Sequence, residues 1–204
     1  MFGELDIRLL STTIASGLAV IGYMPYIRDI FKNKTKPHFY TWFIWVATQA
    51  IALTALIKGG DEFGVISLAV NTGLILFVFL LSFKYGTRDI TKGDKIIIVL
   101  ALLAIVAWWQ LDNLLMAVFI ISIISGLGYV LTLRRSYSEP WLETTSYWLI
   151  MTISTVLILT SLSAYNLLTV TYLAVLSVGN LSLYIMLLWR RRYVVAPNYL
   201  NIPN

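Results

Sequence analysis

The sequence predicts an all-α integral membrane protein with seven transmembrane helices in a 3+1+3 arrangement, and three observations support this. Hydrophobic residues make up 59% of the 204 residues and charged residues only 12%, whereas soluble domains carry about 25% charged residues. Long stretches lack Asp, Glu, Lys, Arg and His, and their apolar residues run continuously, without the alternation of a membrane β-barrel. A pattern of three such stretches occurs twice.

Six uncharged windows locate the predicted helices. A spanning helix needs about 20 residues, and the last window is more than twice that long. A polar break at Ser161, Ser163, Tyr165 and Asn166 interrupts it, so we predict two helices there and seven in all. The fourth window is the shortest, and Asp112 follows it closely. The windows cover residues 9–27, 39–57, 63–83, 96–111, 113–133 and 144–189.

The order of the windows divides the chain into two three-helix units joined by a linker helix. The N-terminal segment MFGELDIR carries acidic residues where a signal peptide is positively charged, so we expect the first window to be a retained helix. The first unit covers residues 1–86, the linker helix 87–112, the second unit 113–192 and the C-terminal tail 193–204.

Lysine and arginine residues predict the orientation of the chain. With seven spans, the loops after helices 1, 3 and 5 lie on the same side as the C-terminus. That side holds 13 of the 15 Lys and Arg residues, and the other side holds the remaining 2. The positive-inside rule places the N-terminus outside and the C-terminus in the cytoplasm. We therefore predict a protein of the plasma or inner membrane.

An internal repeat with an offset of 106 residues relates the two three-helix units. Because three helices reverse the direction of the chain, the single linker helix returns the second unit to the orientation of the first. This predicts two parallel three-helix repeats, and transporters built in this way bind substrate near the midplane between the repeats. The clearest matching pairs are Gly22 and Gly128, Tyr23 and Tyr129, Arg28 and Arg134, and Trp42 and Trp148.

These features resemble the SWEET and PQ-loop (MtN3/saliva) superfamily of seven-helix transporters. The resemblance rests on the 3+1+3 order, the outside N-terminus, the Gly22-Tyr23-x-Pro25 end of the first helix and the basic loops after helices 1 and 5. It implies a uniporter that moves a small neutral polar solute, with a sugar as one candidate, by alternating access. The chain has Pro25-Tyr26 where PQ-loop proteins have Pro-Gln, and Leu131 where SWEET proteins have a second proline.

Pro25 is the candidate hinge. A proline leaves the carbonyl four residues earlier without its helical hydrogen bond and kinks the helix. In the SWEET family such prolines act as hinges for alternating access, and the resemblance implies the same role here. The alternative is that Pro25 ends the first helix before the basic loop.

Asn71 and Asn180 are the leading substrate-binding candidates. Each lies inside an apolar run, SLAVNTGLILF or LSVGNLSLYIM. An unpaired amide in lipid is costly, so both side chains should face the bundle interior. The resemblance implies a substrate site, because asparagines of helices 3 and 7 flank the sugar in SWEET proteins. The alternative is that both amides only hold neighbouring helices together.

Helices 2 and 6 supply further candidates for the walls of the site, namely Gln49, Thr54 and Thr160. The Gln49 amide needs partners outside its own helix, whereas the two hydroxyls can instead bond their own backbone. The tryptophans are predicted mainly as anchors at the membrane interfaces. Trp45 and Trp148 are predicted to lie deeper, where stacking on a sugar is an alternative.

The sequence lacks the residues that several kinds of chemistry require. The chain has no cysteine, and its only histidine, His38, is predicted to lie in a solvent-exposed loop, so we expect no metal site and no cofactor. No nucleophile–base pair, HExxH motif or phosphate-binding loop is found, so we do not predict an enzyme. Membrane topology explains the basic residues better than nucleic-acid binding does. No ionisable residue lies inside the predicted spans, so transport should not depend on a proton gradient.

Two other functions remain open. One is a non-transporting seven-helix receptor of the KDEL-receptor type, although that branch uses charged cavity residues that the predicted spans lack. The other is a vitamin-type transporter on the same fold. The predicted partners are the lipid bilayer and a small-molecule substrate, and the sequence leaves the oligomeric state open, a homo-oligomer included.

Overall fold

The computed structural model describes residues 2–59, 62–109, 114–160, 165 and 167–197. Within these ranges the chain forms seven α-helices, one short 3₁₀ helix and no strand, so the all-helical prediction is confirmed. The elements are α1 (Phe2–Phe31), α2 (Phe39–Gly59), α3 (Glu62–Tyr85), α4 (Lys92–Trp109), α5 (Leu114–Ser138), η1 (Pro140–Leu142), α6 (Thr145–Thr160) and α7 (Leu167–Arg190).

The helices follow the uncharged windows but extend past them. The window 144–189 divides into α6 and α7, and Asp112 and most of the predicted polar break lie outside the described residues. Helix α1 continues through Pro25 to Phe31, so the alternative that Pro25 ends this helix is wrong. Helix α4 begins with a capping box, in which the Thr91 amide donates to Asp94 and the Asp94 amide donates to the Thr91 hydroxyl.

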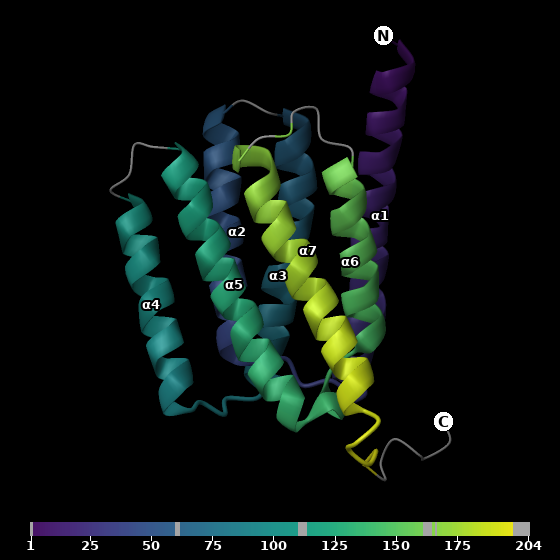
Figure 1. Ribbon diagram of the computed structural model, residues 1–204, viewed down its shortest axis with the longest axis vertical. Coiled ribbons are helices and arrows are strands. Elements are labelled where there is room, and N and C mark those ends of the chain that lie inside the picture. Colours follow the sequence, from purple (N-terminus) through teal and green to yellow (C-terminus); the bar gives the residue numbers. More distant parts are fainter. Residues whose placement is uncertain (1, 60–61, 110–113, 161–164, 166, 198–204) are drawn as a thin grey trace.

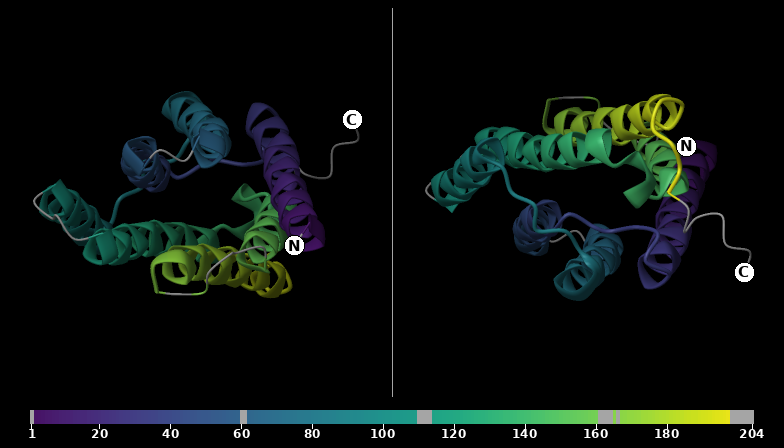
Figure 2. Two further views of the ribbon diagram at one scale, coloured as in Figure 1. Left: turned by 90° about the horizontal axis from the view of Figure 1, so that it is seen from above. Right: turned by 90° about the horizontal axis from the view of Figure 1, so that it is seen from below.

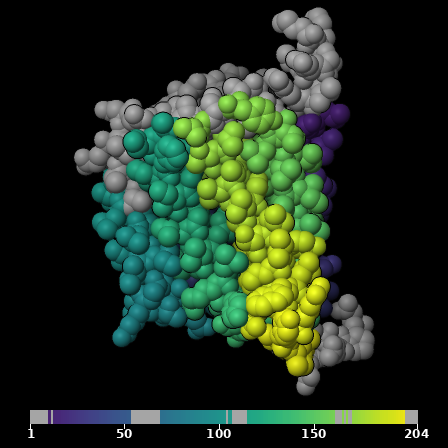
Figure 3. Space-filling view, viewed as in Figure 1, coloured from purple at the N-terminus to yellow at the C-terminus, as the bar shows by residue number. Residues whose placement is uncertain are grey.

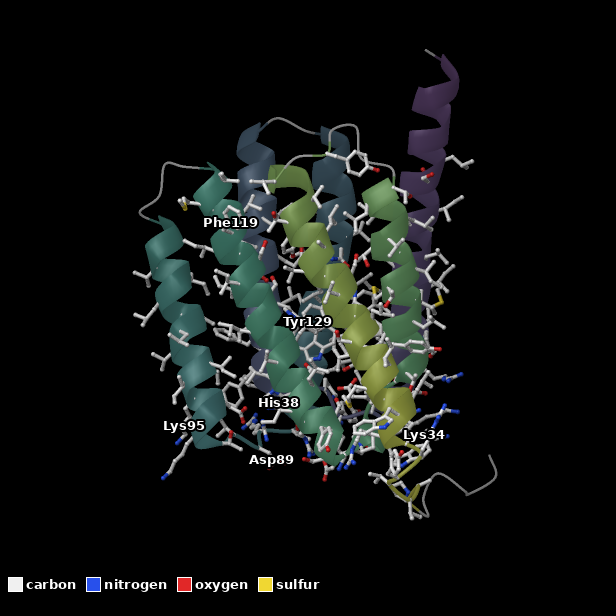
Figure 4. All side chains as sticks on the ribbon, viewed as in Figure 1. Lys34, His38, Asp89, Lys95, Phe119 and Tyr129 are labelled. Atoms are coloured by element: carbon white, nitrogen blue, oxygen red, sulfur yellow. The ribbon has the colours of Figure 1, made fainter. Side chains whose placement is uncertain are left out.

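The helices alternate in direction, with the start of α1 at one end of the bundle and the end of α7 at the other (Figure 1). The connections after α1, α3 and α5 lie at the same end as the end of α7, and we call this end the basic end. Lys34, Asp89 and Lys95 mark it in Figure 4, where Tyr129 lies nearer the middle of the bundle.

The helix contacts repeat in the two halves of the chain (Figure 2). In the first half α3 packs against α1 and α2, and in the second half α7 packs against α5 and α6. Between the halves, α1 packs against α6 and α2 packs against α5. If α1 is matched with α5, α2 with α6 and α3 with α7, each of these contacting pairs therefore has an equivalent pair. Helix α4 stands outside the pattern and packs mainly on α5.

Two glycines at matching positions bring helices of the two halves close together. A Cβ added to Gly22 in α1 would lie 2.9 Å from the Cε of Met151 in α6. A Cβ added to Gly128 in α5 would lie 2.6 Å from the Nε1 of Trp45 in α2. Met151 and Trp45 are 106 positions apart, as the two glycines are. The packing between the halves therefore follows the same correspondence as the sequence repeat.

A cluster of seven buried aromatic side chains, which we call the aromatic cluster, fills the core on the side of the basic end. The cluster draws on α1, α2, α5 and α6, so it joins the two halves. Trp42 is therefore packed between helices and does not serve as an interfacial anchor, and Trp45 and Trp148 are buried in the same cluster. Its members are Tyr23, Tyr26, Trp42, Trp45, Tyr129, Tyr147 and Trp148, and each is at most 7% exposed.

Large apolar side chains cover the outer faces of the bundle. Met24 is 61% exposed, Ile123 60% and Val178 65%, and Figure 3 shows the face that α4, α5 and α7 form. Two described helical segments, Leu115–Ser138 and Val170–Arg190, are long and apolar enough to cross a membrane. Three further apolar helices are shorter, namely Phe39–Leu53, Ala69–Tyr85 and Thr145–Thr160.

Candidate functional site

Asn180 is buried and already has a partner. Its side chain is 4% exposed, and the Tyr129 hydroxyl donates a hydrogen bond of 2.8 Å to its Oδ1. The contact is possible because Gly179 has no side chain, since a Cβ there would lie 2.5 Å from the Tyr129 ring. Asn180 therefore links α7 to α5, as the helix-holding alternative requires, while its amide NH₂ group can still donate.

Asn71 lies in a different setting. It is half-buried in α3, and it lies about one helical turn farther from the basic end of its helix than Asn180 does in α7. In the part of the chain that the structure describes, no hydrogen bond joins the two amides. That the two amides flank one solute therefore stays a prediction.

The predicted wall residues separate into different environments. Gln49 is 5% exposed, and its Oε1 has no hydrogen-bond partner among the described residues. Ser177 in α7 was not predicted, but its hydroxyl is also buried without a partner there. Thr160 is exposed and donates to the carbonyl of Leu157 in its own helix, and the Thr54 side chain lies outside the described residues.

Glu143 is the residue that the sequence interpretation missed. It follows η1, is 5% exposed, and accepts a hydrogen bond of 3.2 Å at Oε2 from the Nε1 of Trp148. The Tyr26 hydroxyl faces the same carboxyl from α1 but makes no hydrogen bond of standard geometry with it. Burial raises the pKa of Glu143 to about 8. Glu143 is therefore a buried ionisable group that lies just outside the predicted spans.

The position of Glu143 explains why it was missed. It directly precedes an uncharged window, and an acidic residue at the edge of such a window is ordinarily interpreted as part of a solvent-exposed loop. The preceding Pro140-Trp141-Leu142 run is the local signal that this segment packs inward, because it is apolar and aromatic. Pro140 is indeed buried.

A polar hollow of about 270 Å³ lies beside Glu143 at the basic end. It is lined by the end of α1, by the segment 141–146 and by Arg191. The Arg191 guanidinium donates to the carbonyls of Pro140 and Glu143 and stacks on the Trp141 ring, 4.7 Å from its centroid. Burial lowers the pKa of Arg191. Arg191 therefore fixes the backbone that carries Glu143.

A chain of hydroxyls closes the other wall of this hollow. The Oγ1 atoms of Thr35 and Thr144 are 2.6 Å apart, and the Thr144 hydroxyl donates to Asp29 Oδ2 at 3.0 Å. Thr35 must then be the donor in its bond to Thr144, because each hydroxyl has a single proton. These bonds tie the loop after α1 to the start of α6.

His38 is buried, and the prediction that it is exposed to solvent is wrong. It is 1% exposed, its Nε2 lies 3.2 Å from the Asp89 carbonyl, and its Nδ1 lies 3.1 Å from Thr41 Oγ1. A carbonyl can only accept, so Nε2 is the donor. Burial lowers the pKa of His38. The loop after α1 is therefore packed against the segment after α3, where His38 pairs with Thr87.

Comparison with protein-family models, with curated proteins and with solved structures gave no match. The likeness to SWEET and PQ-loop proteins therefore stays a prediction from sequence motifs. Within the described residues, no group of three or more His, Cys, Asp or Glu side chains is arranged to hold a metal ion.

Proposed function

We propose that the chain is an integral membrane transporter of a small neutral polar solute, working by alternating access between two parallel three-helix repeats. The observation that carries this proposal is the equivalence of the contacts made by α1–α3 and α5–α7. Two like-oriented units that meet across α1–α6 and α2–α5 can rock against each other about a site between them.

The outer surface supports a membrane location. Soluble monomers rarely expose large contiguous apolar patches, whereas exposed Leu, Ile, Val and Met side chains occur on the outer faces of all seven helices except α2, where Phe43 is the exposed example. We propose that all seven helices span the membrane, with the basic end in the cytoplasm. Leu115–Ser138 and Val170–Arg190 meet the length and composition of a span by themselves.

The interior supports a solute that forms hydrogen bonds. Gln49 Oε1 and Ser177 Oγ are buried polar atoms without partners among the described residues, and Asn180 uses only its Oδ1 in the bond from Tyr129. Buried polar groups rarely stay unpaired in folded proteins, so water or a solute is the expected partner. Hydroxyl and amide groups favour a neutral polar solute over an ion.

The aromatic cluster suggests which end is closed. It lies on the side of the basic end and joins α1 and α2 to α5 and α6, with Tyr26 and Tyr147 at 4.6 Å and Trp45 and Tyr129 at 5.0 Å between ring centroids. In the proposed cycle these rings separate to open the basic end. Pro25, one residue before Tyr26 in α1, is placed to absorb that movement.

Counterflow in proteoliposomes tests the proposal. A panel of neutral sugars and neutral vitamins is offered as radiolabelled solute, and one class should accumulate against unlabelled solute inside. For that solute, Gln49→Leu and Asn180→Ala should reduce uptake by about tenfold or more, which corresponds to the loss of a hydrogen bond. Thr160→Ala is the matched control and should transport normally, because its hydroxyl bonds its own helix. Absence of counterflow for every solute would favour a receptor instead.

A further inference from the structure

The carboxyl group of Glu143 lies between two environments. On one side are Trp148, which donates to Oε2, and the Tyr26 hydroxyl of the aromatic cluster. On the other side is the polar hollow, whose wall includes Glu143 itself. Glu143 therefore lines a hollow at the basic end, while its carboxyl is bonded to Trp148 and lies near Tyr26 of α1.

We propose that Glu143 is a proton-operated latch, which in its neutral form holds the first turn of α6 against α1 and in its ionised form releases the basic end. This proposal rests on the proposed function in one respect, which is that opening of the basic end would be a step of the transport cycle. A neutral carboxyl can remain among aromatic rings with one donor, whereas a carboxylate there lacks the hydration it needs. Opening the hollow supplies that hydration.

The charged and titratable groups around Glu143 leave burial as the dominant influence. Asp29 at the end of α1 and Lys34 in the following loop line the same hollow, and Arg135 of α5 acts on the carboxyl from a distance. Arg191, after α7, donates to backbone carbonyls, and no salt bridge within the described residues reaches the Glu143 carboxylate. Tyr26 and Tyr147 are the titratable groups nearest in the aromatic cluster.

The position of the hollow sets the sidedness of the latch. It opens at the basic end, so the compartment facing that end supplies and removes the proton. Burial raises the pKa of Glu143 to about 8, so ordinary buffers can change the ionisation of this carboxyl. A basic-end compartment of lower pH should therefore favour the closed arrangement seen here.

Distance measurements between spin labels test the latch without any solute. The chain has no cysteine, so labels can be placed at exposed Lys32, after α1, and exposed Ser138, at the end of α5. Electron–electron double resonance is recorded at about pH 6 and about pH 10, on either side of the Glu143 pKa. We expect one short distance at low pH and an added longer distance at high pH, with a midpoint near 8.

Two variants decide the outcome. Glu143→Gln, which cannot ionise, should keep the short distance at both pH values, and the control His38→Gln should behave like the parent. The latch is overturned if Glu143→Gln still opens with pH or if the parent shows no change.

A second variant serves if Glu143→Gln fails to fold. Trp148→Phe keeps the carboxyl but removes the hydrogen-bond donor that stabilises its ionised form, so the midpoint of opening should rise. An unmoved midpoint also overturns the latch. A titrating distance without solute counterflow would refute the transporter alone.

Discussion

The Tyr129 hydroxyl in α5 donates a 2.8 Å hydrogen bond to the amide oxygen of Asn180 in α7. Both side chains are buried, so this bond satisfies one acceptor that would otherwise be unpaired inside the bundle. It also joins two helices of the same half of the chain. The two interpretations of Asn180, substrate binding and helix holding, can therefore be separated by removing its partner.

Tyr129→Phe should lower the free energy of unfolding by about 1–3 kcal/mol, because it leaves the Asn180 oxygen buried and unpaired. If Asn180 only holds helices, the double variant Tyr129→Phe/Asn180→Ala should cost little more than either single variant. Thermal unfolding in detergent measures all three. Additive losses would show that Asn180 has an important partner other than Tyr129.

Gly179→Ala should destabilise the protein by about 1–3 kcal/mol, because the new Cβ would lie 2.5 Å from the Tyr129 ring. Gly17→Ala is the matched control, since Gly17 is a helical glycine with nothing within 4 Å of the added Cβ. There the change should be neutral or slightly stabilising, because alanine favours helices more than glycine does. Equal effects at both positions would contradict the close packing of α7 on α5.

Glu143 should make the protein less stable as the pH rises. Its pKa is raised from 4.5 to about 8, so the folded protein keeps a proton that the unfolded chain loses above its ordinary value. The contribution of Glu143 to the free energy of unfolding is complete below pH 4.5. It falls by up to ~1.4 kcal/mol per pH unit as the pH rises, and it is gone above about pH 8. Glu143→Gln should remove this slope and be more stable than the parent at high pH. Parallel curves of melting temperature against pH would contradict the burial of the carboxyl.

His38 should have the opposite effect. Because burial lowers its pKa below 6.5, the unfolded chain binds a proton that the folded protein refuses. The contribution of His38 to the free energy of unfolding is therefore complete above pH 6.5. It is lost as the pH falls toward the lowered pKa of the folded protein. Comparison of melting temperatures between neutral and mildly acidic buffer should show a smaller acid loss for His38→Gln than for the parent.

The matching of aromatic pairs allows a test of the repeat. Tyr23 and Trp42 pack with centroids 6.4 Å apart at 61°, and Tyr129 and Trp148 pack 6.3 Å apart at 62°. Tyr23→Leu and Tyr129→Leu each remove one member of a matched pair. We expect similar losses of stability, with the larger loss at Tyr129 because only that residue also bonds Asn180. A much larger loss at Tyr23 would contradict the equivalence of the two positions.

Local patterns in the sequence were enough to predict the helical class and the places where helices form. Apolar windows of 16 residues or more are longer than ordinary strands and lack the alternation of a half-buried strand, so they favour helices, and this signal is local. The offset of 106 positions also predicted which residues would match, because Gly22 and Gly128 contact α6 and α2 in equivalent ways. These properties depend on neighbours in the chain or on a fixed spacing, so one sequence suffices to read them.

Contacts between helices that are distant in the chain establish which polar groups are buried and what they touch. Glu143 and His38 lie in short connections that look solvated in sequence, yet packing of α1 against α6 and of the segment 86–89 against the loop after α1 encloses them. The bond that Asn180 accepts depends on a residue 51 positions earlier. Burial and pairing arise from helices that meet across long distances in the chain, and a local pattern in the sequence does not record those meetings.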